Sequence, residues 1–468
     1  MTTKENNSET PRLKPVLNMW ETLAGALGAN GPAAVTALYF TSLAGLVGGS
    51  MMLDILLAWL IYVAMTVVVY DWSKDVAAAH SWTVIQRKGF NSALAAYFAG
   101  WTYWAYYLTG SVGFAVLGLS SFVYLLIPKA PSWLWIPIAL AIIAETSILA
   151  YLGIKPSNKY ILYTGLYMEV PFLIVTALIL IIMAGPKNSV LPFTVKPVNN
   201  NWILILTTMI FGITTFGGMN QVIPLAEETV DPKRNVPRAL AAIAIILGVT
   251  IMLNGYAQEV IYGINKMAQY SQLPDPGVII YGKYLGVVGA ALLIAFVVNS
   301  FNSSALAFFN SEVRMAFGLA RDGVIFPRRF VNLNKYGAPG DAIIFLAILN
   351  AVVAIAAGIA LGPLWGGVWL LTFNSVFMAL NHLLAAIGIA RYRHKYGGFG
   401  IIRHIVIPAI VVGALATFIV LSVYPAPPPP ITYAPYAAFI WIILGIVAYY
   451  IEKRKRPEAI AKLGLFSV

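Results

Sequence analysis

The sequence predicts an all-α protein that crosses a membrane many times. Three observations support this fold class: 60% of the 468 residues are hydrophobic, only 10% are charged, and long apolar stretches recur along almost the whole chain. A soluble domain has about 45–50% apolar and roughly 25% charged residues, whereas a helix that spans a bilayer needs about 20 mostly apolar residues. Continuous apolar runs indicate helices, because the strands of a membrane β-barrel alternate in short segments.

Twelve apolar stretches are expected to be transmembrane helices. They group into a first five-helix repeat (19–184), a second, inverted five-helix repeat (202–390) and two further helices (403–452), flanked by an N-terminal tail (1–18) and a basic C-terminal tail (453–468). The expected spans are 19–48, 51–73, 91–127, 133–153, 159–184, 202–228, 237–262, 285–318, 341–362, 364–390, 405–424 and 434–451.

The basic residues predict the orientation of the chain. With twelve spans, 25 of the 30 Lys and Arg residues fall on the side that holds both tails. The opposite side holds five: Lys129, Lys187, Lys196, Lys266 and Lys283. Positive residues gather on the cytoplasmic side of membrane proteins. Both tails are therefore expected in the cytoplasm of a cell-membrane protein, and the net charge of +12 indicates topology instead of a nucleic-acid partner.

The sequence contains little that points to an enzyme. There is no cysteine, and the histidines His80, His382, His394 and His404 are scattered with no metal-ligand spacing. Neither a phosphate-binding glycine loop nor a nucleophile motif occurs. We therefore expect no catalytic residues, no resident metal and no cofactor.

Two expected spans are interrupted by residues that suit a helix poorly. The first contains GANGP at 28–32, and the sixth contains FGGMNQ at 216–221. The breaks lie five spans apart, which predicts two five-helix repeats of opposite orientation. Interrupted spans at matching positions indicate the binding site of a transporter, because free backbone groups there can bind a charged ligand near the membrane midplane. The alternative is that each break is a simple kink.

Two longer motifs make the chain resemble the amino acid/polyamine/organocation (APC) superfamily of transporters. FGGMNQVIPLAEETVDPKRNVPRAL, residues 216–240, resembles its sixth helix and following loop. NSEVRMAFGLARDGVIFPRRFVNLNKYGAPGDAI, residues 310–343, resembles its eighth helix and the loop to the ninth. The resemblance implies the LeuT-type fold, with discontinuous helices 1 and 6, and transport of amino acids, polyamines or related amines by alternating access.

The same resemblance suggests a substrate site at the two breaks. Gly28 belongs to this expected site, and the amides around Ala29, Asn30 and Gly31 would bind a carboxylate. Carbonyls near Phe216 and Gly217 would accept from an ammonium group, and Phe216 would act as a lid. Gly218 belongs to the same expected site, in which Met219 and Asn220 would contact the side chain. From the third span, Trp104 and Tyr107 either face this pocket or only pack.

Asn220 stands where many members carry glutamate, which favours a neutral substrate because a desolvated cation needs a carboxylate partner.

Three polar residues are candidates for ion coupling. Glu169, inside the fifth span, is either a protonatable switch or a structural acid. Ser303 and Ser304, in NSFNSS of the eighth span, either coordinate sodium or form hydrogen bonds between helices. The sequence thus favours a proton-coupled symporter of neutral amino acids. Open alternatives are sodium coupling, exchange, a polyamine or nucleobase substrate, and a membrane sensor of amino acids. The sequence does not indicate the oligomeric state.

Overall fold

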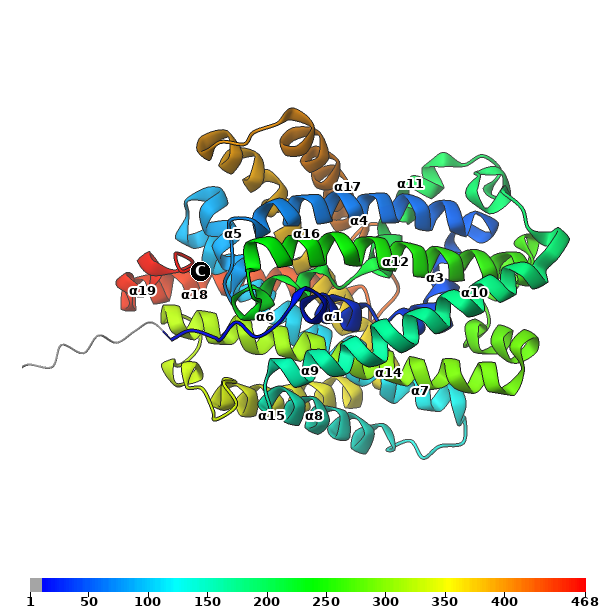
Figure 1. The fold of residues 1–468 in the computed structure, drawn as a ribbon, viewed down its shortest axis with the longest axis horizontal. Coiled ribbons are helices and arrows are strands. Elements are labelled where there is room, and N and C mark those ends of the chain that lie inside the picture. Colours follow the sequence, from blue (N-terminus) through cyan, green and yellow to red (C-terminus); the bar gives the residue numbers. More distant parts are fainter. Residues whose placement is uncertain (1–10) are drawn as a thin grey trace, which may run out of the picture.

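The computed structural model describes residues 11–468, except for the side chain of Phe114. Residues 1–10 of the expected N-terminal tail lie outside the described part. Within that part the protein is helical, with isolated β-bridges at Leu17–Thr229 and Leu333–Pro339. Most of the long helices run side by side along the longest axis of the molecule, and the start of the described chain and the C-terminus lie at the same end of this bundle (Figure 1). We call that end the termini end.

Each of the twelve apolar stretches is helical in the structure. The first five comprise α1 (Met19–Asn30) to α3 (Phe40–Val47), then α4 (Met51–Ser73), α6 (Ala93–Gly110) with α7 (Gly118–Leu126), α8 (Trp135–Tyr151), and α9 (Ile154–Ile161) with α10 (Val170–Ala184). The next five comprise α11 (Trp202–Gly212) with the 3-10 turns that follow it, α12 (Pro232–Tyr262), α14 (Pro276–Asp322), α15 (Gly340–Leu361) and α16 (Pro363–Tyr396). The last two are α17 (Ile407–Leu421) and α18 (Tyr433–Lys455).

Length and composition support a membrane protein with many spans. In the described chain, nine helical stretches are long and apolar enough to cross a membrane, or ten if a bent pair around residues 217–218 counts as one span. One stretch, Met19–Ser73, contains two expected spans, which the 3-10 turn Gly48–Ser50 separates. The remaining expected span is α8, a shorter apolar helix of 17 residues.

Local sequence explains how α1 begins. The Asn18 side chain accepts hydrogen bonds from the amides of Trp20 and Glu21, both over 2.9 Å, and Glu21 Oε2 accepts from the Asn18 amide over 2.9 Å. This reciprocal capping box satisfies amides that a helix start leaves free. Every residue of α1 from Glu21 to Asn30 is buried. The first helix therefore lies in the core, where it packs against α9, α12 and α14.

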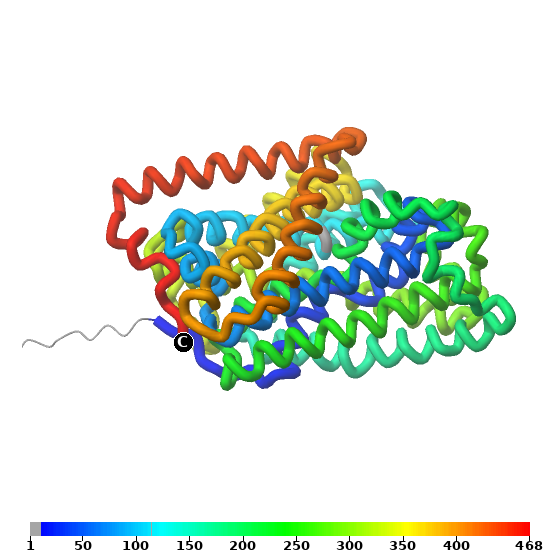
Figure 2. Tube along the Cα trace, turned by 90° about the horizontal axis from the view of Figure 1, so that it is seen from above, coloured from blue at the N-terminus to red at the C-terminus, as the bar shows by residue number. Residues whose placement is uncertain are grey.

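The structure changes some expected boundaries. Helix α14 has 47 residues, longer than the expected span 285–318, and it is kinked at Gly286, where φ is 74°. Helix α5 (Ser81–Phe90) lies between the expected second and third spans, in a segment to which no helix was assigned. Helix α18 continues to Lys455, and α19 (Pro457–Lys462) follows it, so the expected tail 453–468 is largely folded. Figure 2 shows this last segment returning from α18 toward the start of the described chain.

Candidate functional site

The first break lies at Gly31, which has a left-handed backbone with φ of 62°. Ala29 and Asn30 are the last residues of α1, and the Gly31 amide donates to Leu27 O over 3.2 Å. The next residue, Pro32, has no N–H. The expected carboxylate site around residues 28–31 stays a prediction. In the structure the Gly31 amide is already bonded to Leu27 O, and Ala33 carries the first N–H of the half-helix after the break.

Glu169 occupies that half-helix start. The Ala33 amide donates to Glu169 Oε1 over 2.9 Å, and Ser300 Oγ donates to the same oxygen over 2.7 Å. The Asn299 side-chain amide donates to Glu169 Oε2 over 2.9 Å. Glu169 is only 1% exposed. Its carboxylate thus joins the segment after the first break to α14, at the positive end of a helix dipole.

The second break lies at Gly217 and Gly218, where the two halves of the sixth stretch meet at 41°. Gly218 has a left-handed backbone with φ of 113°, and a Cβ atom there would lie 2.2 Å from Ala26 O of α1. At Gly217 the nearest atom to such a Cβ would be Thr214 O at 3.7 Å, and φ is −54°. Only the second glycine is therefore required for the close contact between the two broken helices.

Asn30 connects the two breaks directly. Its side-chain amide donates to Thr215 O over 2.9 Å and to Gly217 O over 3.2 Å. The buried Oδ1 atom of Asn30 has no hydrogen-bond partner among the described residues. Gly217 O, one of the carbonyls expected to accept from an ammonium group, thus already accepts one hydrogen bond, and Asn30 Oδ1 is an acceptor without a partner beside the break. The ring of Phe216 is buried and lies 5.8 Å from that of Tyr62.

Asn220 is held by the third and tenth stretches. Its Nδ2 donates to Tyr106 OH over 3.0 Å, its Oδ1 accepts from Tyr103 OH over 3.3 Å, and Tyr107 OH donates to its backbone carbonyl over 2.7 Å. His382 Nε2 on α16 lies 2.6 Å from Asn220 Oδ1. Sequence reasoning named Tyr107 and Asn220 and missed the other three. The spacing of Tyr103, Tyr106 and Tyr107, which share one helix face, was a signal for two of them.

Two further predicted residues, Trp104 and Met219, have different surroundings. The rings that pack on Trp104 belong to Phe326 and Trp441, so this indole faces α18 and the loop after α14 instead of the breaks. Met219 is buried, and its sulfur lies 3.8 Å from the hydroxyl of Thr66.

The two predicted serines of α14 lie against the first helix. Ser304 Oγ donates to Gly28 O over 2.8 Å. A Cβ on Gly28 would come within 3.0 Å of Ser303 O, so the two helices touch here. The buried Ser303 Oγ has no hydrogen-bond partner in the described chain. Within residues 11–468, no group of three or more acidic or histidine side chains is arranged to hold a metal ion.

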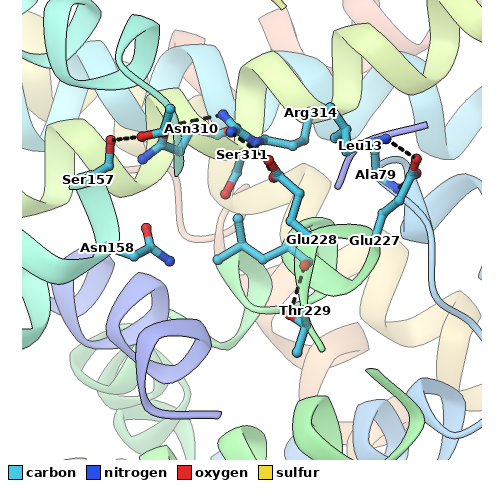
Figure 3. Close-up of polar contacts among 12 residues, drawn as sticks. Leu13, Ala79, Ser157, Asn158, Glu227, Glu228, Thr229, Asn310, Ser311 and Arg314 are labelled. Carbon is cyan, nitrogen blue, oxygen red and sulfur yellow. Dashed lines mark hydrogen bonds and ion pairs between the residues drawn. The ribbon is translucent and has the colours of Figure 1, made fainter. Parts of the chain in front are cut away.

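Toward the termini end, two buried ion pairs join the segment after the second break to α14. Figure 3 shows the pair of Arg314 and Glu228, with Glu227 and its partner amides of Leu13 and Ala79 beside it. Arg314 Nε donates to Glu228 Oε2 over 2.8 Å, and a second nitrogen donates to Oε1 over 3.2 Å. Arg321 donates to both oxygens of Glu227, over 2.8 and 3.0 Å. The amides of Leu13 and Ala79 each donate to Glu227 over 3.0 Å. We call these pairs the inner ion pairs.

The fold and the two broken helices define a polytopic membrane protein of the transporter class. The family model for amino acid permeases matches residues 22–461. The chain belongs to the amino acid permease family, a part of the APC superfamily.

Individual proteins similar to this chain match it at low identity and over part of their length. A D-serine/D-alanine/glycine transporter of Escherichia coli (strain K12) is 28% identical over 272 residues, which cover 56% of this chain and 56% of that protein. The lysine-specific permease LysP of Lactococcus lactis subsp. cremoris (strain MG1363) is 26% identical over 321 residues, covering 64% of this chain and 60% of that one. The aromatic amino acid transport protein AroP of Salmonella typhimurium (strain SL1344) is 23% identical over 317 residues, covering 62% and 64%. The chain thus spans from 56% to 64% of the length of these relatives.

Proposed function

We propose that this permease is a proton-coupled symporter that moves a neutral amino acid by alternating access. In this proposal all twelve stretches cross the membrane, the first ten form two inverted repeats of the LeuT type, and the termini end is cytoplasmic. The first, second, sixth and seventh of the twelve stretches form a bundle that rocks against the other stretches. The single observation that carries the proposal is the hydrogen bond from the Ala33 amide to the buried carboxylate of Glu169.

The coupling follows from what protonation does to that contact. An ionised carboxylate accepts strong hydrogen bonds, roughly twice as strong as those of a neutral group. A proton on Glu169 weakens its hold on the Ala33 amide and on Ser300, which frees the half-helix after the first break. The amide of Ala33 then becomes available to a substrate carboxylate. Proton binding and substrate binding thereby favour the same conformation, which is the requirement for symport.

The neutral substrate follows from the second break. Asn220 places an amide there, and its atoms bond to Tyr103, Tyr106 and His382. No ionised carboxylate is part of this group of residues, so a cationic side chain would be desolvated without a partner. The relatives named above are described as transporters of D-serine, D-alanine and glycine, of lysine, and of aromatic amino acids. In this proposal, the residues around Asn220 decide the substrate of this chain.

The test is uptake into proteoliposomes, with an inward proton gradient and no sodium. The panel contains labelled glycine, alanine, serine, leucine, phenylalanine and lysine together with one diamine. Uptake of a neutral member that collapses when the proton gradient is dissipated is the expected result. Uptake of lysine or the diamine alone would refute the neutral substrate, and uptake that requires sodium would refute the proton coupling.

A further inference from the structure

Residues 456–468, which we call the C-terminal clasp, fold back onto the termini end of the bundle. Ile460 and Leu463 are 3% and 0% exposed. Gly464 has φ of 70°, and a Cβ atom there would lie 3.0 Å from both Arg87 Cβ and Thr83 O of helix α5. The clasp is thus seated against its neighbours too closely to be a solvated tail.

Hydrogen bonds attach the clasp to two different parts of the protein. The Gly464 amide donates to Asp322 Oδ2 at the end of α14 over 2.8 Å. The Val468 amide donates to Ala77 O over 2.8 Å, and the Ala77 amide donates to Ser467 Oγ over 2.9 Å. Ala77 lies in the loop after α4, so five residues of the clasp join that loop to α14.

Phe466 lies directly on an inner ion pair. The guanidinium carbon of Arg321 is 3.7 Å from the centre of the Phe466 ring, and that of Arg12 is 5.5 Å away. The Arg321 side chain is 2% exposed, and its Nε and one terminal nitrogen have no hydrogen-bond partner among the described residues. The ring face therefore supplies an attraction that these nitrogens otherwise lack, since cations favour the negative face of an aromatic ring.

The elements joined in this way have to separate if this end of the bundle opens. Glu227 belongs to the segment after the second break, and Ala77 follows α4; both lie in the bundle that rocks in the proposed mechanism. Arg321 and Asp322 end α14, which belongs to the stationary part. Opening at the termini end pulls Glu227 away from Arg321, and the clasp holds the same two parts together.

We propose that the C-terminal clasp keeps the termini end closed at the inner ion pairs, with Phe466 as the residue that positions Arg321 on Glu227. The clasp leaves its seat each time the termini end opens. This inference rests on the alternating access proposed above, but it does not depend on the substrate or on the coupling ion.

The chain has no cysteine, so one introduced thiol can report opening without any substrate. Ser311 is 1% exposed and lies on α14 between Arg314 of the inner ion pairs and Ser304 at the first break; its hydroxyl donates to Ala307 O of the same helix. The reporter is S311C, and the measurement is its rate of alkylation by N-ethylmaleimide in purified protein, followed by intact mass. F466A is expected to raise this rate about fivefold, as the loss of a cation–π contact permits.

The neighbouring residue Leu465 provides the matched control because it is 61% exposed. S311C/L465A is expected to label at the same rate as S311C. S311C/F466Y, which keeps an aromatic ring at this position, is also expected to label as slowly as S311C. F466L keeps an apolar side chain at the same place and serves as the second variant if F466A lowers the melting temperature. Labelling of F466A and F466L at the parent rate, in monodisperse protein with unchanged melting temperature, would overturn the inference. Proton-driven amino-acid uptake together with that result would refute the clasp alone and leave the proposed function standing.

Discussion

The carboxylate of Glu169 accepts a hydrogen bond from the backbone amide of Ala33 over 2.9 Å, inside the protein and next to the first helix break. This contact joins the fifth stretch to the part of the first stretch that follows its break. This amide is the first one after Gly31 and Pro32, and it also lies 3.2 Å from Ser300 Oγ. In the proposed mechanism, protonation of Glu169 releases it.

Replacement of Glu169 by Gln is expected to lower proton-driven uptake about tenfold or more. The hydrogen bond to a charged group, roughly 1.5–3 kcal/mol, can then no longer form when a proton is released, so the half-helix is not returned to its bound position. The amide keeps the size of the side chain but cannot bind and release a proton. The remaining uptake should lose its dependence on external pH. Initial rates measured in proteoliposomes between pH 5 and pH 8 check this.

Glu145→Gln is the control for Glu169→Gln. Glu145 accepts from the Asn302 side-chain amide over 3.0 Å, and among the described residues it forms no hydrogen bond with residues 28–33. Its pH profile is expected to match that of the parent. A Glu169→Gln protein whose uptake still rises on acidification would exclude Glu169 as the coupling group.

The two adjacent glycines of the second break should respond differently to alanine. At Gly218 the new Cβ would lie 2.2 Å from Ala26 O, and the backbone has φ of 113°, so Gly218→Ala must push the two broken helices apart. We expect it to abolish uptake and to lower the melting temperature in detergent. Gly217→Ala, whose Cβ would have its nearest contact at 3.7 Å, should retain both. Equal behaviour of the two variants would contradict the close packing of Gly218 on α1.

Much of this architecture could be predicted from the sequence because it depends on local composition. Apolar stretches mark the helices, and GANGP and FGGMNQ mark the two breaks. The identity of the free amides could not be predicted as well, since helix ends are uncertain by one or two residues. A shift of that size separates the amides predicted at residues 28–31 from the amide of Ala33, which is the first N–H after Pro32.

The partners of Asn220 depend on contacts between distant parts of the chain. His382 lies in an apolar stretch 162 positions away from Asn220, and nothing in its own surroundings marks it as a polar contact. The C-terminal clasp was missed for a related reason: its sequence reads as a basic tail, and only packing against α5 and α14 orders it.

Tyr107 should matter through its hydroxyl group. Tyr107→Phe removes the hydrogen bond to Asn220 O, which spans 2.7 Å, and keeps the ring. Such a bond contributes about 0.5–1.5 kcal/mol, so the Michaelis constant for the transported amino acid is expected to rise by a few-fold while the maximal rate changes little. Tyr163→Phe, at a tyrosine that is 57% exposed, is the control that should leave both constants unchanged. An unchanged Michaelis constant in Tyr107→Phe would remove this residue from the site.

Asn30 should be sensitive to charge. Asn30→Asp replaces an amide that donates to Thr215 O and Gly217 O by a carboxylate, which faces the same carbonyls with no donor when ionised. We expect uptake to be lost at neutral pH. Asn30→Ala, which removes the bonds without adding a charge, should retain more activity. Uptake by Asn30→Asp equal to that of the parent at neutral pH would show that the two breaks do not need this link.

The ion pair of Arg314 and Glu228 should contribute to stability in a way that depends on both partners. Arg314→Met leaves the buried carboxylate of Glu228 without its partner, and breaking a buried pair in this way costs about 3–5 kcal/mol. The double variant Arg314→Met/Glu228→Met removes both charges, so it should recover a large part of the lost stability. Thermal unfolding of the purified variants in the same detergent measures the three differences. A double variant less stable than Arg314→Met would show that the two side chains do not act as a pair. If the double variant is stable but labels faster at an introduced S311C, the pair also holds the termini end closed, which separates its role in stability from its role in gating.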